Sequence, residues 1–213
     1  MRTVLPCPAW CVEHDDPDPF EPGDGGRHCG HELPVLVGAP ARFGLPVLFV
    51  QLNAHDCDGR RHSWIDLVAP SRAHAELTVA QARRLADALI AVGDLWEARV
   101  PAGMLPPCPP WCEWHDEAMD PESDQWHCGP VRTVPVLGPL RSGAEVRVQL
   151  CAGDTRAGRR VVVGLTVWDD EMTELTGAEA RRLAAALLNA ADDLNAADDL
   201  DTADAEGRLA PPD

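Results

Sequence analysis

The chain reads CPAWCVEH at residues 7–14 and CPPWCEWH at residues 108–115, so one short stretch occurs twice. An acidic loop that contains proline follows each copy, and a His-Cys-Gly triplet then appears at 28–30 and at 127–129. Thiols and imidazoles that recur at this spacing are typical of a metal site with four protein ligands, most simply a zinc site. The repeat therefore predicts two such sites and two similar structural units.

The candidate metal ligands occupy corresponding positions in the two copies. Adjacent side chains on an extended backbone point to opposite sides, so only one member of each His-Cys pair can face the ion. Four protein ligands would close the coordination sphere, and closed zinc sites are structural. We expect two zinc ions per chain, one held by Cys7, Cys11, His14 and either His28 or Cys29, the other by Cys108, Cys112, His115 and either His127 or Cys128.

The same cysteines allow a second interpretation, in which Cys7 bridges Cys11 as a disulfide, as the corresponding pair would in the second copy, and the histidines lie on the surface. No export signal opens the sequence, and no apolar run approaches the roughly 18 residues of a membrane helix. We therefore expect a cytoplasmic protein that does not span a membrane. Paired cysteines in that reducing compartment more often bind metal than form disulfides, which favours zinc.

The duplication divides the 213 residues into two units of ordinary domain size. In each unit, three apolar runs after the His-Cys-Gly triplet predict a three-stranded antiparallel meander. These runs cover 33–38, 47–52 and 62–68, and then 134–138, 145–150 and 161–168. The predicted boundaries are 1–98 for the first unit, 99–107 for a linker rich in Pro and Gly, 108–200 for the second unit and 201–213 for a disordered acidic tail.

Each unit ends in a strong helix signal. Thr78 precedes Gln81 by three residues, and Thr176 precedes Glu179 in the same way, which is the pattern of an N-terminal capping box. Leucines at three- and four-residue spacing after each box predict an amphipathic helix. The expected fold class is α+β, with two tandem repeats that each contain a zinc-binding loop, a three-stranded antiparallel sheet and one C-terminal helix that covers that sheet.

The combination of Cys-Pro-x-Trp-Cys, a following His, a later His and Leu-Thr-x-x-Glu-Ala-Arg-Arg-Leu-Ala resembles a family of small actinobacterial proteins of uncharacterised function. Members of that family usually hold one such unit, and this chain would hold two. The resemblance implies that His28 and His127, and not the cysteines after them, are the fourth ligands. The chain departs from the family pattern at those cysteines and at Gln81, which replaces Glu. The resemblance implies no activity.

Three classes of function fit a small zinc protein. The sequence contains no Gly-rich phosphate loop, no His-Glu-x-x-His and no nucleophile elbow, so we expect a non-enzymatic module that meets an unknown protein partner or has a regulatory role. A zinc hydrolase would need only three ligands and a water, with Glu13 or Glu113 as general base, but these two residues are out of register between the copies. A nucleic-acid-binding module is disfavoured by the net charge of −17, although the Arg pairs at 60–61 and 159–160 could cluster on one face.

The metal interpretation makes a stoichiometric prediction. Reduced, purified protein should contain close to two zinc ions per chain by elemental analysis, because each repeat carries its own ligand set. A metal-free protein with a bridged cysteine pair in each copy would instead support the disulfide interpretation.

Overall fold

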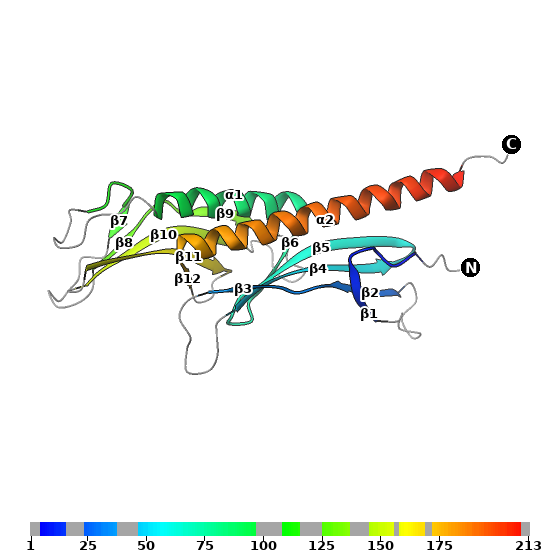
Figure 1. The fold of residues 1–213 in the computed structure, drawn as a ribbon, viewed down its shortest axis with the longest axis horizontal. Coiled ribbons are helices and arrows are strands. Elements are labelled where there is room, and N and C mark those ends of the chain that lie inside the picture. Colours follow the sequence, from blue (N-terminus) through cyan, green and yellow to red (C-terminus); the bar gives the residue numbers. More distant parts are fainter. Residues whose placement is uncertain are drawn as a thin grey trace.

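The structure is a computed structural model that describes residues 5–15, 24–37, 47–96, 108–115, 125–136, 145–155, 158–168 and 172–209. Each repeat forms a six-stranded antiparallel sheet followed by one helix (Figure 1). The first sheet contains β1 (Cys11–Asp15), β2 (Asp24–Gly30), β3 (Leu33–Leu36), β4 (Val47–Cys57), β5 (Arg60–Val68) and β6 (His74–Leu77). The second contains β7 (Trp114–His115), β8 (Gln125–Cys128), β9 (Arg132–Pro135), β10 (Glu145–Thr155), β11 (Gly158–Val167) and β12 (Thr173–Leu175).

Both sheets have the same topology, built around one long strand. In the first sheet the order is β1-β2-β4-β5-β6, and β3 also pairs with β4. Strands β2 and β3 share one edge of β4, because β3 pairs with its residues 47–50 and β2 with its residues 53–57. In the second sheet, β8 and β9 pair with β10 in the same arrangement. The candidate metal-binding motifs therefore lie at the end of each sheet that β1 and β2, or β7 and β8, extend.

The predicted meander is present as β3, β4 and β5 and as β9, β10 and β11, but the predicted strand count was wrong, because each sheet has six strands. Strands β1 and β2 lack an alternating apolar pattern, and β6, β7, β8 and β12 are only two to four residues long. Strand β2 reads DGGRHCG. Backbone pairing with β4, and not a pattern of apolar side chains, holds it in the sheet. At Gly25 an added Cβ would lie 2.6 Å from the Cβ of Asp56, so the close approach of these strands requires glycine.

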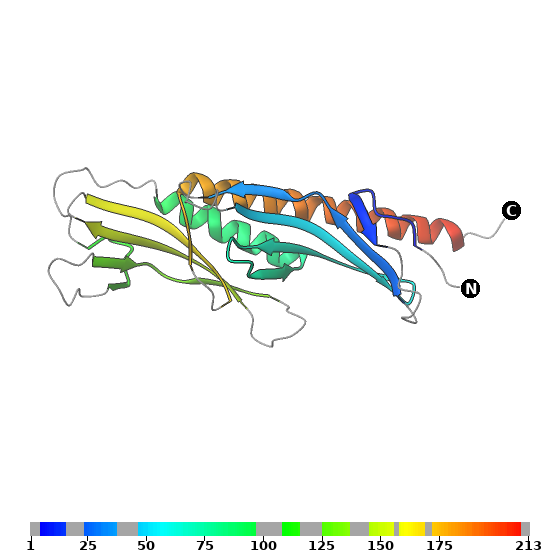
Figure 2. The same cartoon turned by 90° about the horizontal axis from the view of Figure 1, so that it is seen from below.

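The helices do not cover the sheets that the sequence assigned to them. Helix α1 (Val79–Trp96) packs mainly against β9, β10 and β11, and α2 (Gly177–Leu209) packs mainly against β3, β4 and β5. The two helices also pack against each other on the same side of both sheets, as Figures 1 and 2 show. The prediction that each helix covers its own sheet was therefore wrong: the repeats exchange their helices.

This exchange produces one hydrophobic core that both repeats share. Leu85 and Leu89 of α1 and the corresponding Leu183 and Leu187 of α2 are completely buried in it. The contacts between the helices occur in matching pairs: Arg83 bonds Asp192 at 2.9 Å, and Arg181 bonds Asp94 at 2.9 Å. These ion pairs are exposed and contribute little free energy, so the shared burial of leucine side chains accounts for most of the stabilisation.

Both capping boxes are confirmed. The Thr78 N–H donates to Gln81 Oε1 at 2.8 Å, and the Gln81 N–H donates back to Thr78 Oγ1 at 3.3 Å. The second box has the same two bonds, at 2.6 and 3.2 Å, between Thr176 and Glu179. Each helix therefore begins where the sequence predicted, because local hydrogen bonds that need no tertiary contact define its first turn.

The C-terminal helix is longer than the sequence analysis predicted. Helix α2 extends to Leu209, so the stretch 201–209, for which we predicted disorder, is helical, and 210–213 lie outside the described residues. Once a helix is nucleated, each further residue adds a hydrogen bond at little cost, and this segment contains no proline before Leu209. Neither α1 nor α2 combines the length and the apolar character that a membrane-crossing helix needs.

Helix exchange predicts that damage to one repeat's helix appears in the other repeat's sheet. Leu187→Ala should destabilise the chain by about 2–5 kcal/mol, the usual cost of a buried leucine-to-alanine change. Hydrogen exchange should accelerate first in β4, under α2, and the matched variant Leu89→Ala should first expose β10. Faster exchange confined to the repeat that carries each mutation would contradict the exchanged packing.

Candidate metal centres

The first candidate centre brings together three of the predicted ligands. The ligand atoms of Cys7, Cys11 and His28 lie within 4.8 Å of one another. The Sγ atoms of Cys7 and Cys11 are each 3.6 Å from Nδ1 of His28. A zinc ion about 2.3 Å from sulfur and about 2.0–2.1 Å from nitrogen holds such ligands roughly 3.5 Å apart at a tetrahedral angle. The spacing of these atoms therefore fits a tetrahedral ion.

The second centre repeats this arrangement with Cys108, Cys112 and His127. The Sγ atom of Cys108 is 3.6 Å from Nδ1 of His127, the same separation as in the first centre. The two centres lie at opposite ends of the molecule, because β1 and β2 extend one sheet away from β7 and β8 of the other (Figure 1). Each could therefore bind a metal ion separately, and the two do not form a binuclear site.

A short turn and a tryptophan position the two thiols of each loop. In the first loop the Cys11 N–H donates to the Pro8 carbonyl at 3.0 Å, and in the second the Cys112 N–H donates to Pro109 at 2.9 Å. The Trp10 ring lies over Gly30, where an added Cβ would be 3.4 Å from ring atom Cε3. The Trp111 ring packs over Gly129 in the same way. The glycine of each His-Cys-Gly triplet thus provides room for the indole that anchors the cysteine loop.

A buried carboxylate orients the histidine of each centre. The Nε2 atom of His28 is 3.1 Å from Oδ2 of Asp56, and that of His127 is 3.0 Å from Oδ2 of Asp154. An ionised carboxylate only accepts hydrogen bonds, so a proton on Nε2 of His28 satisfies this contact and leaves the Nδ1 lone pair for the two thiols. At the second centre an Arg159 nitrogen also lies 3.3 Å from Nε2 of His127. This carboxylate–histidine pairing is the usual support of a metal-binding imidazole.

An arginine completes each group and keeps its carboxylate ionised. Arg61 donates to both oxygens of Asp56, at 2.8 and 2.9 Å, and the side chains of Arg61 and Asp56 are only 7% and 6% exposed. Burial raises the pKa of Asp56, but the hydrogen bonds from Arg61 and His28 outweigh it and hold the pKa below its usual range. Arg61 also donates to the Pro6 carbonyl at 2.7 Å, which ties the residue before Cys7 to the sheet.

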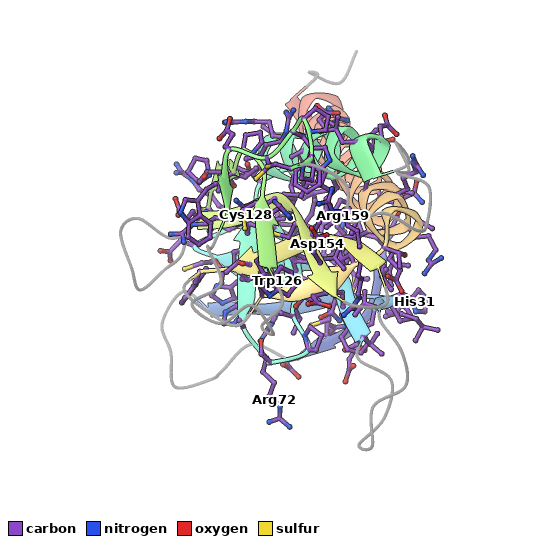
Figure 3. All side chains as sticks on the ribbon, turned by 90° about the vertical axis from the view of Figure 1, so that its left-hand side faces the viewer. His31, Arg72, Trp126, Cys128, Asp154 and Arg159 are labelled. Atoms are coloured by element: carbon purple, nitrogen blue, oxygen red, sulfur yellow. The ribbon has the colours of Figure 1, made fainter. Side chains whose placement is uncertain are left out.

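The second centre has the same support. Arg159 donates to Oδ1 and Oδ2 of Asp154 at 2.5 and 2.6 Å. These hydrogen bonds lower the pKa of Asp154, burial opposes them, and the bond from His127 lowers the pKa further. Figure 3 labels Asp154 and Arg159 at this end of the molecule. Both copies therefore contain a His–Asp–Arg chain behind the candidate metal position.

The sequence analysis missed these supporting residues, although the repeat contained a signal for them. Asp56 and Asp154 occupy corresponding positions near the ends of β4 and β10. In each hairpin the paired arginine lies directly across from the aspartate. Aligning the two Gly-Arg-Arg runs made Arg60 equivalent to Arg159, whereas the strand register makes Arg61 its equivalent. The aspartate and the arginine are five positions apart in both hairpins, but Gly59 precedes β5 whereas Gly158 is the first residue of β11, so the alignment by letters concealed the match.

The predicted ligand His14 is not a member of the cluster of Cys7, Cys11 and His28, but it lies beside that cluster. Residues His14 and His28 are direct partners across β1 and β2, so their side chains share one face of the strand pair. Their ring centroids are 6.0 Å apart, and His14 is exposed. In the second repeat His115 pairs with His127 in the same register, while its side chain lies outside the described residues. Both histidines are therefore neighbours of a metal centre through strand pairing.

The alternative ligands Cys29 and Cys128 face away from the centres. Each follows its histidine directly in an extended strand, so its side chain lies on the opposite face of the sheet. Cys29 pairs with Asn53 there, and Cys128 pairs with Cys151. Burial raises the pKa of Cys151 to about 12, which keeps this thiol protonated near neutral pH. The structure thus brings the histidine, and not the following cysteine, to each pair of loop thiols.

The comparison with known protein families agrees with this duplication. The family model described as Domain of unknown function (DUF6907) matches residues 1–105 and again residues 96–202. The chain belongs to this family. It contains two copies of the DUF6907 domain, which confirms the predicted tandem repeat, and the two matches overlap at residues 96–105, across the start of the predicted linker. The unit boundaries at 98, 107 and 200 remain predictions. A search of curated proteins finds no match.

Loss of the supporting carboxylate should weaken metal binding without removing a ligand. Asp56→Asn keeps the shape of the side chain but removes its charge, and such changes behind a metal ligand typically reduce affinity about 10–100-fold. Competition with a chromogenic chelator would measure this effect at the first centre. Asp58→Asn, in the exposed turn of the same hairpin, is the matched control and should bind like the unmodified chain. Equal affinity for both variants would contradict a role for the His–Asp–Arg chain.

Proposed function

We propose that this protein is a non-enzymatic, zinc-stabilised module that acts through a protein partner. The observation that supports it most is how each cluster joins a loop to a sheet. Cys7 belongs to the N-terminal loop, Cys11 begins β1 and His28 belongs to β2, so an ion bound by all three would tie the loop to the sheet. The Arg61 side chain supports the same connection through the Pro6 carbonyl. An ion in this position stabilises structure.

The donor set favours zinc. Two thiolates and one imidazole are preferred by zinc and other borderline-soft metals, while magnesium and calcium prefer oxygen ligands. Binding requires deprotonated thiols, and burial together with the Cys11 thiol raises the pKa of Cys7 in the metal-free chain. Metal binding therefore releases protons, and affinity decreases as the pH falls. We propose one zinc ion in each repeat.

We further propose that His14 and His115 complete the two coordination spheres. Strand pairing supports this, because His14 lies on the same face of the sheet as His28 and one ring neighbours the other. A change of side-chain rotamer can turn an exposed histidine toward an adjacent ion without movement of the strand. Each zinc would then have two thiolate and two imidazole ligands, and a site closed in this way leaves no position for a substrate.

A hydrolase remains the alternative, since three protein ligands plus a water are the usual catalytic set. The position of the proposed general base argues against it. Glu13 pairs with Cys29, so it projects from the face of the sheet opposite His28. A groove of about 560 Å³ also lies on that opposite face, lined by Arg27, His55 and Trp64 among others, and not by the thiols. The features that a hydrolase would need are therefore separated by the sheet.

Three of the four arginines in the two hairpins are already paired with carboxylates, which argues against a nucleic-acid-binding function. Arg61 and Arg159 are bonded to buried aspartates, and Arg160 bonds Glu174 at 2.5 Å. Guanidinium groups that are already paired are poorly placed to neutralise phosphates, and the chain carries a net charge of −17. We propose a cytoplasmic location, in agreement with free cysteines throughout the described residues.

Exposed apolar side chains on the two metal loops support a protein partner. Trp114 of β7 is 60% exposed and Val12 of β1 is 53% exposed, and both lie within three residues of a candidate ligand. Tryptophan is enriched at the energetic centres of protein interfaces, and exposure of most of an indole is unfavourable in water. We propose that these loops, ordered by zinc, form the contact surfaces at the two ends of the molecule.

Cobalt substitution tests whether the sites are closed. Cobalt(II) in a four-ligand site should show intense visible absorption that added cyanide does not change, because no coordination position is free. The His14→Ala variant should become sensitive to cyanide at the first centre only. Sensitivity of the unmodified chain at both centres, together with ester or phosphoester hydrolysis, would instead support the zinc hydrolase.

Cross-linking in the native host tests the contact surface. Trp114→Ala should reduce the yield of cross-linked partner, while Leu36→Ala, which removes an equally exposed apolar side chain away from the metal loops, should not. Both variants should retain two zinc ions. Equal cross-linking by both variants would place the partner surface elsewhere.

A further inference from the structure

The second repeat contains a pair of adjacent thiols that the proposed function does not use. Cys128 lies on β8 and Cys151 on β10, and the two residues are direct partners across these strands. Their Sγ atoms are 3.9 Å apart, and neither is part of a disulfide. Both thiols lie on the face of the sheet opposite His127, so they are separate from the metal cluster. Figure 3 labels Cys128 beside Trp126 in this strand.

The strand register makes this pair suitable for a disulfide. The N–H of Gly129 donates to the carbonyl of Leu150 at 2.8 Å, so the bond connects the residue after Cys128 with the residue before Cys151. Cys128 and Cys151 are therefore a non-hydrogen-bonded pair, in which the Cα atoms are about 4.5 Å apart and the side chains are closest. Disulfides span Cα separations of about 4.4–6.8 Å, so rotation of the two side chains can close this bond.

We propose that Cys128 and Cys151 form a reversible cross-strand disulfide, with a low-molecular-weight disulfide as the oxidant. The deprotonated sulfur of Cys128 attacks the small disulfide, forms a mixed disulfide and releases one small thiol. Cys151 then attacks the sulfur of Cys128 in that mixed disulfide and gives up its proton, which the departing sulfur takes as it leaves as the second small thiol. Two protein thiols lose two hydrogens and two electrons, which the small disulfide gains as it is reduced to two thiols.

Accessibility decides the order of these steps. Cys128 is half-buried and can meet a small molecule, while Cys151 is only 2% exposed and can react only with its neighbour. A Cα separation at the short end of the disulfide range also strains the bond, and strained disulfides are the more easily reduced ones. The bond should therefore respond to the ratio of small disulfide to small thiol, and not be permanent.

The disulfide would connect the strands that carry the second metal centre. Strand β8 supplies the ligand His127, and β10 supplies its supporting Asp154. A covalent bond one residue from His127 would hold β8 against β10 even without the ion. The first repeat lacks this possibility, because Cys29 pairs with Asn53. The inference therefore assigns to the second repeat alone an oxidation-dependent link between the strands that hold its metal site.

The experiment uses the full, zinc-loaded chain and oxidised glutathione as the probe. Intact mass spectrometry should show the loss of two hydrogens, and peptide mapping without reduction should show a Cys128–Cys151 link. Excess reduced glutathione should restore both thiols. The Cys151→Ser variant should lose no hydrogens and should instead accumulate the mixed disulfide at Cys128. Cys57→Ser, which removes a thiol of the first repeat, is the matched control and should behave like the unmodified chain.

Two results would overturn the proposal. One is a link between the loop cysteines, such as Cys108 and Cys112, while Cys128 and Cys151 remain free. The other is an unchanged mass at a glutathione ratio that fully oxidises a control dithiol peptide. Hydrogen exchange after zinc removal gives an independent readout: β8 should exchange more slowly in oxidised than in reduced protein, and this difference should vanish in Cys151→Ser. The test does not depend on the proposed zinc function, since zinc binding is measured separately by elemental analysis.

Discussion

The packing of α1 against α2 is the constraint on which the rest of the structure depends. Each helix presents leucines both to its partner helix and to the sheet of the other repeat, so neither sheet is covered unless both helices are present. A single sheet with one apolar face must bury that face against another layer. The helix pair provides this layer for both sheets at once, and the two repeats consequently share a core.

Close contact between the helices has a local requirement. An added Cβ at Gly93 would lie 3.4 Å from the Gly177 carbonyl, so the end of α1 and the start of α2 approach with almost no side chain between them. The bond of Arg181 with Asp94 lies beside this contact, and the matched bond of Arg83 with Asp192 lies further along the helix pair, near the start of α1. Exposed ion pairs of this kind contribute more to the register between the two helices than to the free energy of folding.

The candidate metal centres lie at the two ends of the molecule, away from the helix pair (Figure 1). In the sequence, the acidic stretch after each cysteine motif contains few apolar side chains that burial could use. The proposed zinc ions would add free energy at these ends, on the order of 10 kcal/mol for a structural site. The buried Asp56–Arg61 and Asp154–Arg159 pairs prepare the histidines in advance, and their mutual neutralisation is what makes buried charge acceptable there. The shared helices and the proposed metal ions would thus stabilise different parts of each repeat.

The repeats share one framework but differ on the face that the helices leave uncovered. In the first repeat this face contains the groove that Arg27, His55 and Trp64 help to line. In the second, Trp126 lies over Gly153, and Met172 packs directly on Gly164. The adjacent thiols Cys128 and Cys151 also occur only in this second sheet. Duplication has therefore kept the helix-covered face alike while the opposite faces have diverged.

The sequence by itself determined the features that depend on local spacing. Capping boxes define helix starts through bonds three residues apart, and alternation of apolar side chains indicates the central strands, so both could be predicted. The Cys-x-x-x-Cys loops and the following histidines were also visible as residue types. Tertiary structure decided which sheet each helix covers, because an apolar helix face does not encode which of two similar sheets it meets. It also decided that Asp56 supports His28, since residues 28 positions apart become neighbours only when β2 pairs with β4.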